Sequence, residues 1–314
     1  MRSYGGAMSV VVVGAGIAGI ACARELAAAG VAVRVLERAR QVGGRLAGRH
    51  LDGRPVDLGA AHLTARDPEF TEVVRRWQDA GLAREWTREL AVLGDGGRTT
   101  SSGPVRFAAP GGLRGLVAAL ADGVDVELEH EVTRVGPGPV VDGEPADAVV
   151  LAMPDPQAAR LFVDPPPVLH APSWTPVITV AAGWARRHWS PLPAAFVNDH
   201  PALTLIADDG DRRGDGAPVL VAHTTADLAR AHDTAPEGAV TPVLDALRDL
   251  LGVTAPPEWT YAHRWRHAAP GQDRPAPFHL GDDGIAFAGD GWGGARVETA
   301  WRSGTLLARA LSGS

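Results

Sequence analysis

His62 is the first residue whose type and setting could carry chemistry. It follows Asp57-Leu58-Gly59-Ala60-Ala61, a short strand-like run of small side chains that would let a flat ring approach the backbone, or that simply packs tightly. Histidine can donate, accept or shuttle a proton near neutral pH. We therefore predict His62 as a catalytic residue. A purely structural histidine is the alternative that the sequence leaves open.

Trp265 and His267 are the other two catalytic candidates. They belong to the segment Tyr261–Ala268, which alternates strictly in residue type. In a strand, successive side chains point to opposite faces, so Trp265 and His267 share one face with His263, and two arginines take the other. The first face could line a cavity for a planar or anionic molecule. An ordinary sheet strand with one solvated face fits the same pattern.

A dinucleotide-binding turn is predicted near the start of the sequence. The apolar run Val10–Val13 leads into Gly14-x-Gly16-x-x-Gly19 and then into a helix from Ile17 to about residue 29. In this pattern the first glycine allows the turn, the second lets the backbone approach a pyrophosphate, and the third lets helix and strand pack closely. Glu37 ends the next strand, where a carboxylate can bind a ribose diol and repels a 2′-phosphate.

Two further pieces favour FAD over a nicotinamide cofactor. Val42-Gly43-Gly44-Arg45 can wrap a second loop around the pyrophosphate, with Arg45 donating charge-assisted hydrogen bonds. Near the other end, Gly289-Asp290 follows a strand and precedes a helix that starts at about Val297. A carboxylate there can hold ribityl hydroxyls, and the helix N-terminus can stabilise negative charge on a reduced flavin.

These sites need a mainly α/β framework. The start of the chain predicts a βαβ unit with parallel strands, and the tryptophan-rich middle predicts an antiparallel sheet. The helices are expected at residues 17–29, 67–81, 112–120, 243–251 and 297–311. The strands are expected at residues 10–13, 31–36, 124–128, 148–153, 177–182, 203–207, 219–223 and 285–288.

Composition excludes several classes of protein. The chain has 314 residues, a 45% hydrophobic content and a net charge of −7, which argues against nucleic acid as a partner. No apolar run is long enough to span a membrane, and a single cysteine, Cys22, agrees with the cytoplasm. There is no lysine, so no step can use one, and no Cys/His cluster has metal-binding spacing. His188 and His223 carry no predicted role. Residues 1–7 are expected to be an extension.

Taken together, these residues resemble the flavin-dependent amine oxidase superfamily, and most closely its renalase-like branch. The resemblance covers nearly the whole chain after Met8 and rests on a set of short motifs. They are Gly14 to Gly19, Val42-Gly43-Gly44-Arg45, Asp57-Leu58-Gly59-Ala60, Phe107-Ala108-Ala109-Pro110-Gly111-Gly112, His263-Arg264-Trp265-Arg266, and Gly289-Asp290 with Val297-Glu298. Renalase-like sequences commonly carry Gln-Tyr where this chain has Ala61-His62, and often an aromatic residue where it has His267. The substrate is therefore less defined than the fold.

The resemblance implies a non-covalent FAD, a Rossmann-type FAD-binding domain and a discontinuous α+β substrate domain. The FAD domain would take residues 8–62, 104–155 and 281–314, and the substrate domain residues 63–103 and 156–280. The residues implied to contact FAD are Gly14, Ala15, Gly16, Ile17, Ala18, Gly19, Glu37, Arg38, Gly44, Arg45, Gly59, Ala60, Val132, Met153, Gly289, Asp290 and Val297. Val132 is placed in a strand after Leu128, where its backbone would meet the adenine.

The implied activity is that of an oxidase acting on a small molecule and O2. A hydride would pass from a reduced pyridine nucleotide, an isomeric dihydro-NAD(P), to flavin N5, and O2 would become H2O2. An amine oxidase or desaturase of the wider superfamily is the first alternative, and a non-catalytic flavin-binding module is the second. The chain is expected to be a monomer or homodimer, with no nucleic acid, membrane or metal as a partner.

Overall fold

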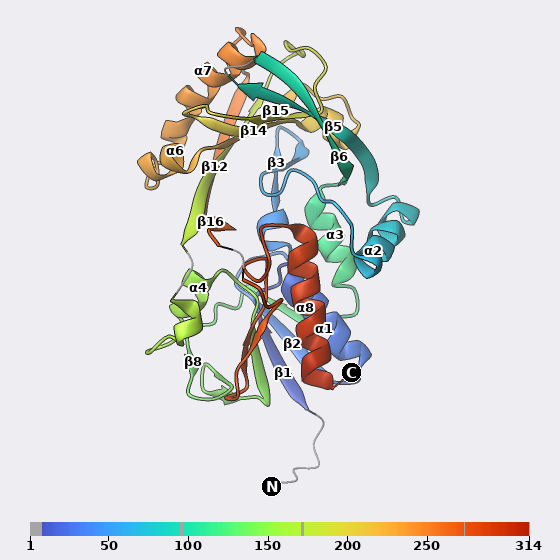
Figure 1. The fold of residues 1–314 in the computed structure, drawn as a ribbon, viewed down its shortest axis with the longest axis vertical. Coiled ribbons are helices and arrows are strands. Elements are labelled where there is room, and N and C mark those ends of the chain that lie inside the picture. Colours follow the sequence, from blue (N-terminus) through green and yellow to red (C-terminus); the bar gives the residue numbers. More distant parts are fainter. Residues whose placement is uncertain (1–7, 95–96, 171–172, 273, 314) are drawn as a thin grey trace. The chain divides into compact units, whose positions relative to one another are not determined.

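The computed structural model describes residues 8–94, 97–170, 173–272 and 274–313, so the predicted extension 1–7 lies outside the described residues. The chain forms two compact units, each made of separate segments (Figure 1). Unit 1 runs up to Gly44 and continues with Val117–Trp174 and the chain from Ala269 onward. Unit 2 comprises Arg45–Leu116 and Thr175–Ala268, so residues 45–62 belong to unit 2.

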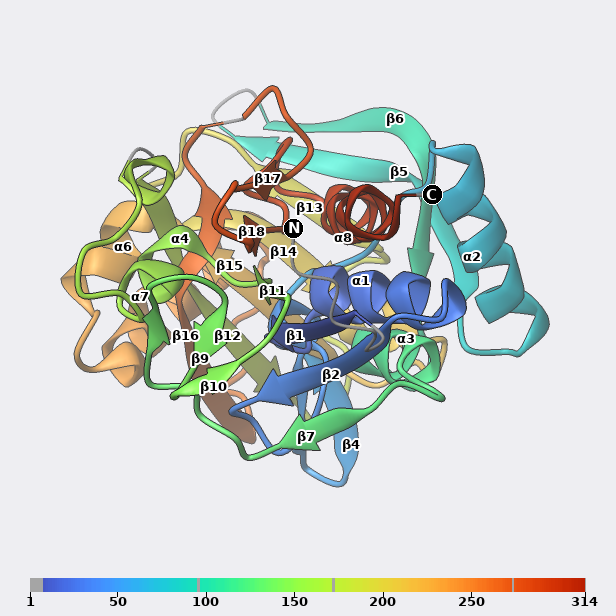
Figure 2. The same ribbon diagram turned by 90° about the horizontal axis from the view of Figure 1, so that it is seen from below.

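Unit 1 is built on a six-stranded sheet in the order β17-β18-β11-β1-β2-β7 (Figure 2). All neighbouring pairs are parallel except β17 with β18 at one edge. The predicted Rossmann-type parallel sheet is therefore confirmed. Its strands are β1 (Ser9–Val13), β2 (Ala32–Glu37), β7 (Val126–Leu128), β11 (Ala148–Leu151), β17 (His279–Leu280) and β18 (Ile285–Phe287). A small antiparallel sheet joins β8 (Val135–Gly136), β9 (Val140–Val141) and β10 (Glu144–Pro145).

Two helices from opposite ends of the sequence pack side by side in unit 1, as both ribbon views show (Figures 1 and 2). They are α1 (Ile17–Ala28) and α8 (Val297–Ser312). A Cβ at Gly304 would lie 2.0 Å from the carbonyl oxygen of Ala18, so only glycine allows this approach. The unit also holds α4 (Asp155–Ala159) and the 3-10 helix η2 (Pro167–Leu169).

Val132 is not in a strand, contrary to expectation. It lies between β7 and β8 in a segment without regular hydrogen bonding, and it is buried in the core of unit 1 with Val135 and Val141. The chain leaves β7 after Leu128, where Glu129 adopts a positive φ of 58° that breaks the extended backbone. The alternation that predicted β7 therefore stops before Val132.

Unit 2 contains a seven-stranded sheet in the order β16-β12-β15-β14-β13-β5-β6. The predicted antiparallel sheet is confirmed for the three strands that predicted it, β12, β14 and β15, and the sheet also contains one parallel pair, β13 with β5. The two strands are far apart in sequence, so no tight hairpin constrains their directions. The strands are β5 (Arg84–Gly94), β6 (Gly97–Ala108), β12 (Trp174–Gly183), β13 (Ala194–Val197), β14 (Leu203–Asp208), β15 (Val219–Thr224) and β16 (Trp259–Pro270).

Unit 2 also contains helices and a two-stranded hairpin. The hairpin pairs β3 (Gly48–Leu51) with β4 (Arg54–Asp57). The helical elements are η1 (Gly44–Leu46), α2 (Pro68–Asp79), α3 (Leu113–Leu120), α5 (Asp209–Arg213), α6 (Ala226–Ala231), η3 (Pro236–Ala239) and α7 (Val240–Leu251). The boundaries between the two units fall inside η1, α3, β12 and β16.

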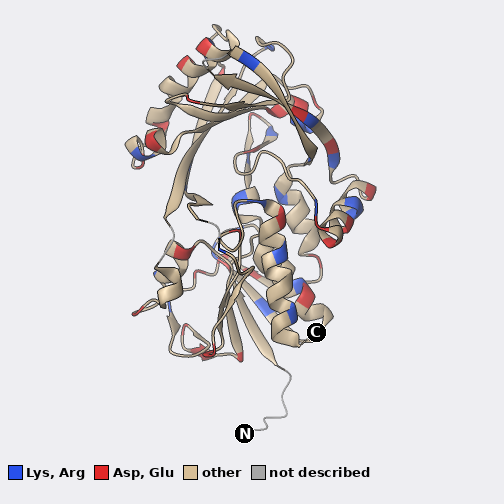
Figure 3. Cartoon of the chain, viewed as in Figure 1, with Lys and Arg blue, Asp and Glu red and all other residues tan. Residues whose placement is uncertain are grey.

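Helix α2 forms where its sequence signals predict it. The Asp67 side chain accepts hydrogen bonds from the amides of Glu69 and Phe70, and Pro68 takes the first helical position. Its apolar side chains, including Trp77, are buried. On its outer face acidic and basic residues are interspersed (Figure 3), and Arg75 pairs with Glu72 and Asp79.

Within the described ranges, no helix has both the length and the apolar character needed to cross a membrane.

Candidate functional site

The glycine turn of unit 1 has the shape that a bound pyrophosphate needs. Gly14 adopts a φ of +105°, and a Cβ at Gly19 would lie 2.0 Å from the Gly14 carbonyl oxygen. Both positions therefore require glycine. A Cβ at Gly16, by contrast, would meet nothing within 4 Å. The space beside Gly16 is open at the N-terminus of α1, where free N–H groups and the helix dipole attract phosphate.

Glu37 and the second glycine loop lie against this turn. The Glu37 carboxylate accepts hydrogen bonds from the amides of Ala15 and Ala39, both at 2.8 Å. A carboxylate has about four lone-pair sites, so acceptors are left for a ribose diol. A Cβ at Gly44 would lie 3.2 Å from the Gly16 Cα, which shows how closely the two loops pack. Arg38 is exposed beside them.

Strand order brings the C-terminal motif to the same edge of the sheet. Strands β1 and β18 both run parallel to β11, so the residues after their carboxyl ends meet at one edge, where open α/β sheets bind ligands. Gly289 has a φ of +145° and its amide donates to the Ser303 hydroxyl at 2.9 Å. Asp290 is buried, and Val297 begins α8. Met153 follows β11 and packs on the core of unit 1.

The open space beside Gly16 and the free acceptors of Glu37 fit a dinucleotide cofactor. The contact of each individual residue with FAD stays a prediction. The predicted cofactor residues of unit 1 are Gly14, Ala15, Gly16, Ile17, Ala18, Gly19, Glu37, Arg38, Gly44, Val132, Met153, Gly289, Asp290 and Val297. Those of unit 2 are Arg45, Gly59 and Ala60. Within unit 2, Arg45 donates one hydrogen bond to the Ala268 carbonyl at 2.9 Å.

Trp265 lies over the small-residue segment of unit 2. Its indole N–H donates to the Leu58 carbonyl at 2.8 Å, and the Thr179 hydroxyl donates to the same oxygen at 2.7 Å. A Cβ at Gly59 would come within 3.4 Å of the Trp265 ring. The structure therefore brings together two segments, around residues 58 and 265, that the sequence separates widely.

The two faces of β16 are used as the alternation predicts. The rings of His263 and Trp265 lie edge to face with centroids 4.4 Å apart, so they share one face. Arg264 and Arg266 both pair with Asp233 on the other. Burial and the nearby positive charges of Arg49 and Arg264 lower the pKa of His263.

His62 lies in a different environment from Trp265. Its ring centroid is 6.2 Å from that of Trp86, and its Nδ1 is buried with no hydrogen-bond partner among the described residues. Burial, followed by the positive charges of Arg106 and Arg212, lowers the pKa of His62 to about 4. His223 lies in the same cluster, and burial and Arg212 lower its pKa to about 4 as well. Both rings are neutral at pH 7.

Arg212 fixes the backbone that carries His62. The side chain is 1% exposed and donates to the carbonyls of Ala61 and Asp57, each at 3.1 Å. It also pairs with Asp209, which is fully buried in α5. Burial alone would raise the pKa of Asp209, but the charges of the surrounding arginines outweigh it and lower the pKa.

Two more arginines, Arg213 and Arg54, join this cluster through the carboxylates of Asp57 and Asp209. Arg213 lies 3.1 Å from Asp57 and 3.1 Å from Asp209, and Arg54 lies 2.6 Å from Asp209. A buried ionic cluster of this kind holds its members in one arrangement, because each charge depends on the others for compensation. The carboxylates of Asp57 and Asp209 are therefore both ion-paired with arginines.

Arg106, Arg212 and His223 were not predicted for this site. Arg106 ends a polar strand that follows Gly97, and Arg212 lies in the run Asp208–Arg213, which has the composition of a solvated turn. His223 has one weak signal, since it interrupts the apolar strand β15 with a polar ring. The other two carry no signal in a single sequence.

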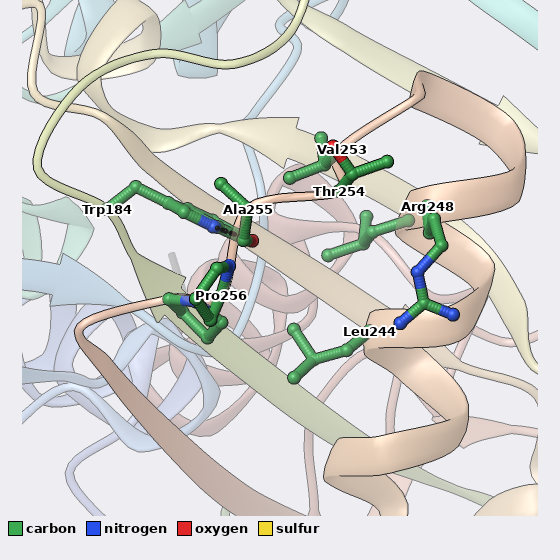
Figure 4. Close-up of a pocket in the computed structure, with 9 residues that line it drawn as sticks. Trp184, Leu244, Arg248, Val253, Thr254, Ala255 and Pro256 are labelled. Atoms are coloured by element: carbon green, nitrogen blue, oxygen red, sulfur yellow. Dashed lines mark hydrogen bonds between the residues drawn. The ribbon is translucent and has the colours of Figure 1, made fainter.

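A surface cavity elsewhere in unit 2 contains none of the predicted residues (Figure 4). It has a volume of about 200 Å³ and is lined by the C-terminal part of α7, the segment after it and Trp184. The Trp184 indole donates to the Ala255 carbonyl at 2.9 Å. In the described part of the chain, no group of three or more His, Cys, Asp or Glu side chains is arranged to hold a metal ion.

The neutral histidines make stability depend on pH. We expect the free energy of unfolding to fall as the pH drops from about 6.5 towards 4. In this range His62 and His223 become protonated in the unfolded state but stay neutral in the folded state, so protonation favours unfolding. At pH 5 each histidine would contribute a loss on the order of 2 kcal/mol. Urea unfolding at pH 7 and pH 5 measures this loss.

The double variant His62→Gln/His223→Gln should show a smaller loss than the natural sequence between the two pH values. His50→Gln, at an exposed position of β3, is the control and should leave the pH dependence unchanged. An equal pH dependence in the double variant and the natural sequence would show that these rings titrate normally.

Comparison with known proteins gives two matching family models. A model described as flavin containing amine oxidoreductase matches residues 75–312, and one described as an NAD(P)-binding Rossmann-like domain matches residues 12–77. Putrescine oxidase from Kocuria rosea is 37% identical over 128 residues, which are 38% of this chain and 26% of the relative. Polyamine oxidase 4 from Oryza sativa subsp. japonica is 47% identical over 55 residues, 18% of this chain and 11% of the relative. The alignments therefore span about a quarter or less of these relatives.

Solved structures of similar fold cover almost the whole chain. A putrescine oxidase bound to putrescine superposes with a TM-score of 0.75 and 19% identity, over 98% of this chain and 99% of that one. Cyclohexylamine oxidase from Brevibacterium oxydans gives a TM-score of 0.76 and 14% identity, over 98% and 99%. At these identities the likeness shows the fold.

Proposed function

This chain belongs to the flavin-containing amine oxidoreductase family, whose cofactor is FAD, and we propose that it oxidises a reduced pyridine nucleotide. In the proposed reaction an isomeric dihydro-NAD(P) gives up a hydride and becomes the pyridinium form. One O2 and one proton take up that hydride as H2O2. When bound, FAD supplies the acceptor that takes the hydride at N5 and passes the electrons to O2.

The charge around His62 is the observation that supports this substrate over an amine. Among the described residues, the side chains that shift the pKa of His62 are Arg106, Arg212 and His223, and no carboxylate is one of them. Asp209 and Asp57, the carboxylates of the buried ionic cluster, are each paired with an arginine. An ammonium group would be repelled here, whereas a neutral ring with an anionic tail would be attracted.

The number of protons released in the two candidate reactions also favours a dihydropyridine over an amine. Amine oxidation to an imine releases a proton as well as a hydride, whereas a dihydropyridine releases only the hydride. With pKa values of about 4, His62 and His223 are weak bases at pH 7. His62 can still donate or accept a hydrogen bond to the substrate.

Anaerobic stopped-flow spectroscopy of the FAD-loaded enzyme tests the proposal. We expect at least one of the 2-, 4- and 6-dihydronicotinamide isomers to bleach the flavin absorbance, followed by rapid recovery and H2O2 release when O2 is admitted. Absence of bleaching with all three isomers would refute the proposed substrate.

Amine oxidation is the second candidate, because the relatives named above include a putrescine oxidase and a cyclohexylamine oxidase. The same enzyme preparation is mixed anaerobically with putrescine, spermidine and cyclohexylamine. Bleaching by an amine and by no dihydronicotinamide would assign the chain to amine oxidation. The cationic surroundings of His62 predict the opposite result.

A further inference from the structure

Arg106 is a nearly buried cation for which the described residues supply no acidic partner. Its side chain extends from β6 and the residue is 7% exposed. Its hydrogen bond runs from Nη1 to the Arg88 carbonyl at 2.9 Å, a neutral acceptor. The other arginines of this region differ, since Arg212 and Arg213 are each paired with a buried aspartate.

An uncompensated charge in this position is costly. Removing a guanidinium from water without a counter-ion costs several kcal/mol in general, and native proteins pair such groups or use them. Burial accordingly lowers the pKa of Arg106, although the group remains charged at neutral pH. An external anion is the partner that would compensate it.

The backbone places His62 beside this arginine. Leu63 and Phe107 form an antiparallel bridge, with N–H···O distances of 3.1 and 2.8 Å in the two directions. In this register His62 lies opposite Ala108. Arg106 precedes Ala108 by two residues on the same strand, so its side chain points to the same face as that of His62. Diagonal neighbours of this kind are about 7–8 Å apart at Cα, within reach of long side chains.

Two features leave polar atoms of His62 and Arg106 without a side-chain partner in the described part of the chain. His62 Nδ1 is buried and has no hydrogen-bond partner among the residues described. The Arg106 guanidinium also lies along Gly103, where an added Cβ would come within 3.2 Å of Nη2. Glycine at that position therefore keeps the outer nitrogens of Arg106 uncovered by a neighbouring side chain.

We propose that Arg106, with His62 beside it, binds an anionic group of the substrate, a carboxylate or a phosphate. The guanidinium would make the charge-assisted contact, and the neutral imidazole would donate a hydrogen bond from whichever nitrogen carries the proton. This inference deepens the proposed function, because it assigns the subsite that recognises the anionic part of the substrate.

The first experiment measures anion binding without turnover, so it does not depend on the proposed reaction. FAD-loaded enzyme is titrated with inorganic phosphate and, separately, with sodium acetate at constant ionic strength, and the flavin spectrum and melting temperature are followed. We expect saturable stabilisation by one of the two. Phosphate alone would identify a phosphate subsite and acetate alone a carboxylate subsite. The variant Arg106→Gln should weaken that binding by ~10-fold or more, the effect of one lost charge-assisted hydrogen bond.

The melting temperature of Arg106 variants distinguishes a ligand-binding role of Arg106 from a structural one. Arg106→Gln should unfold at the same or a higher temperature than the natural sequence, because an uncompensated buried charge is removed. Arg106→Lys should keep part of the anion binding. Arg98→Gln, an exposed position on the same strand, is the control and should change neither quantity.

Turnover then tests the subsite in the reaction. For a reduced nucleotide that bleaches the flavin, Arg106→Gln should raise KM and leave kcat nearly unchanged, and an uncharged N-benzyl-dihydronicotinamide should show no such increase. Three results would overturn the subsite: no saturable anion effect, an effect retained in Arg106→Gln, or loss of FAD or of folding stability in that variant. Failure of all dihydronicotinamides with intact anion binding would overturn only the proposed function.

Discussion

Gly16→Val is expected to lower the FAD content of the purified protein sharply and to leave the apoprotein folded. The Gly16 position has open space around its missing Cβ and an ordinary φ of −73°, so the folded chain can accept a larger residue. The same open space is where a pyrophosphate would meet the amides at the start of α1. Blocking two charge-assisted hydrogen bonds at about 1.5 kcal/mol each weakens binding on the order of 100-fold. Flavin absorbance per mole of purified protein, and FAD titration of the apoprotein, measure the loss.

Two companion variants separate cofactor binding from folding. Gly19→Ala places a Cβ 2.0 Å from the Gly14 carbonyl oxygen, so the backbone must shift, and we expect the apoprotein itself to lose at least about 2 kcal/mol of stability. Gly115→Ala, in α3, meets nothing within 4 Å and should keep both FAD and stability. If Gly16→Val retained a full complement of FAD, the pyrophosphate would have to bind elsewhere.

Arg212→Met is expected to be the most damaging single change in unit 2. It removes the donors to the carbonyls of Ala61 and Asp57 and takes one positive charge from Asp209. Breaking a buried ion pair by removing one partner costs about 3–5 kcal/mol, because the remaining charge and polar groups stay buried. Urea unfolding of the apoprotein measures the loss as a shift of the midpoint.

A conservative variant at the same position and a variant of an exposed arginine serve as comparisons for Arg212→Met. Arg212→Lys keeps the charge but not the planar fork, so it should fall between Arg212→Met and the natural sequence. Arg75→Met removes an arginine from exposed ion pairs on α2 and should leave the midpoint unchanged. An unchanged midpoint in Arg212→Met would mean that the 57–61 segment is held by its other contacts alone.

Local signals were sufficient wherever a short stretch of sequence determines its own structure. The turn from β1 into α1 was predictable because Gly14 and Gly19 are needed for backbone reasons that no other residue satisfies. Helix α2 was predictable because Asp67 caps it through bonds to residues two and three positions away. The shared face of His263 and Trp265 followed from the two-residue period of a strand.

Long-range charge compensation could not be predicted from one sequence. The run Asp208–Arg213 is strongly charged and would ordinarily be solvated, yet Asp209, Arg212 and Arg213 are buried in α5. Their burial is tolerable because the Asp57 carboxylate and Arg54, which lie more than 150 residues earlier in the sequence, pair with Arg213 and Asp209. For the same reason, the parallel pairing of β5 with β13 depends on tertiary contacts between distant segments.

The interleaving of the two units has a consequence for how the protein is made on the ribosome. The last residue of unit 2 is Ala268, so that unit can close while the end of the chain is still being synthesised. Unit 1 begins first but must wait, because β18 and α8 come from its final segment. The helix that packs against Ala18 through Gly304 thus emerges only after the whole of unit 2. Stalled or shortened nascent chains should therefore expose the apolar faces of β11 and α1, where chaperones would be expected to bind.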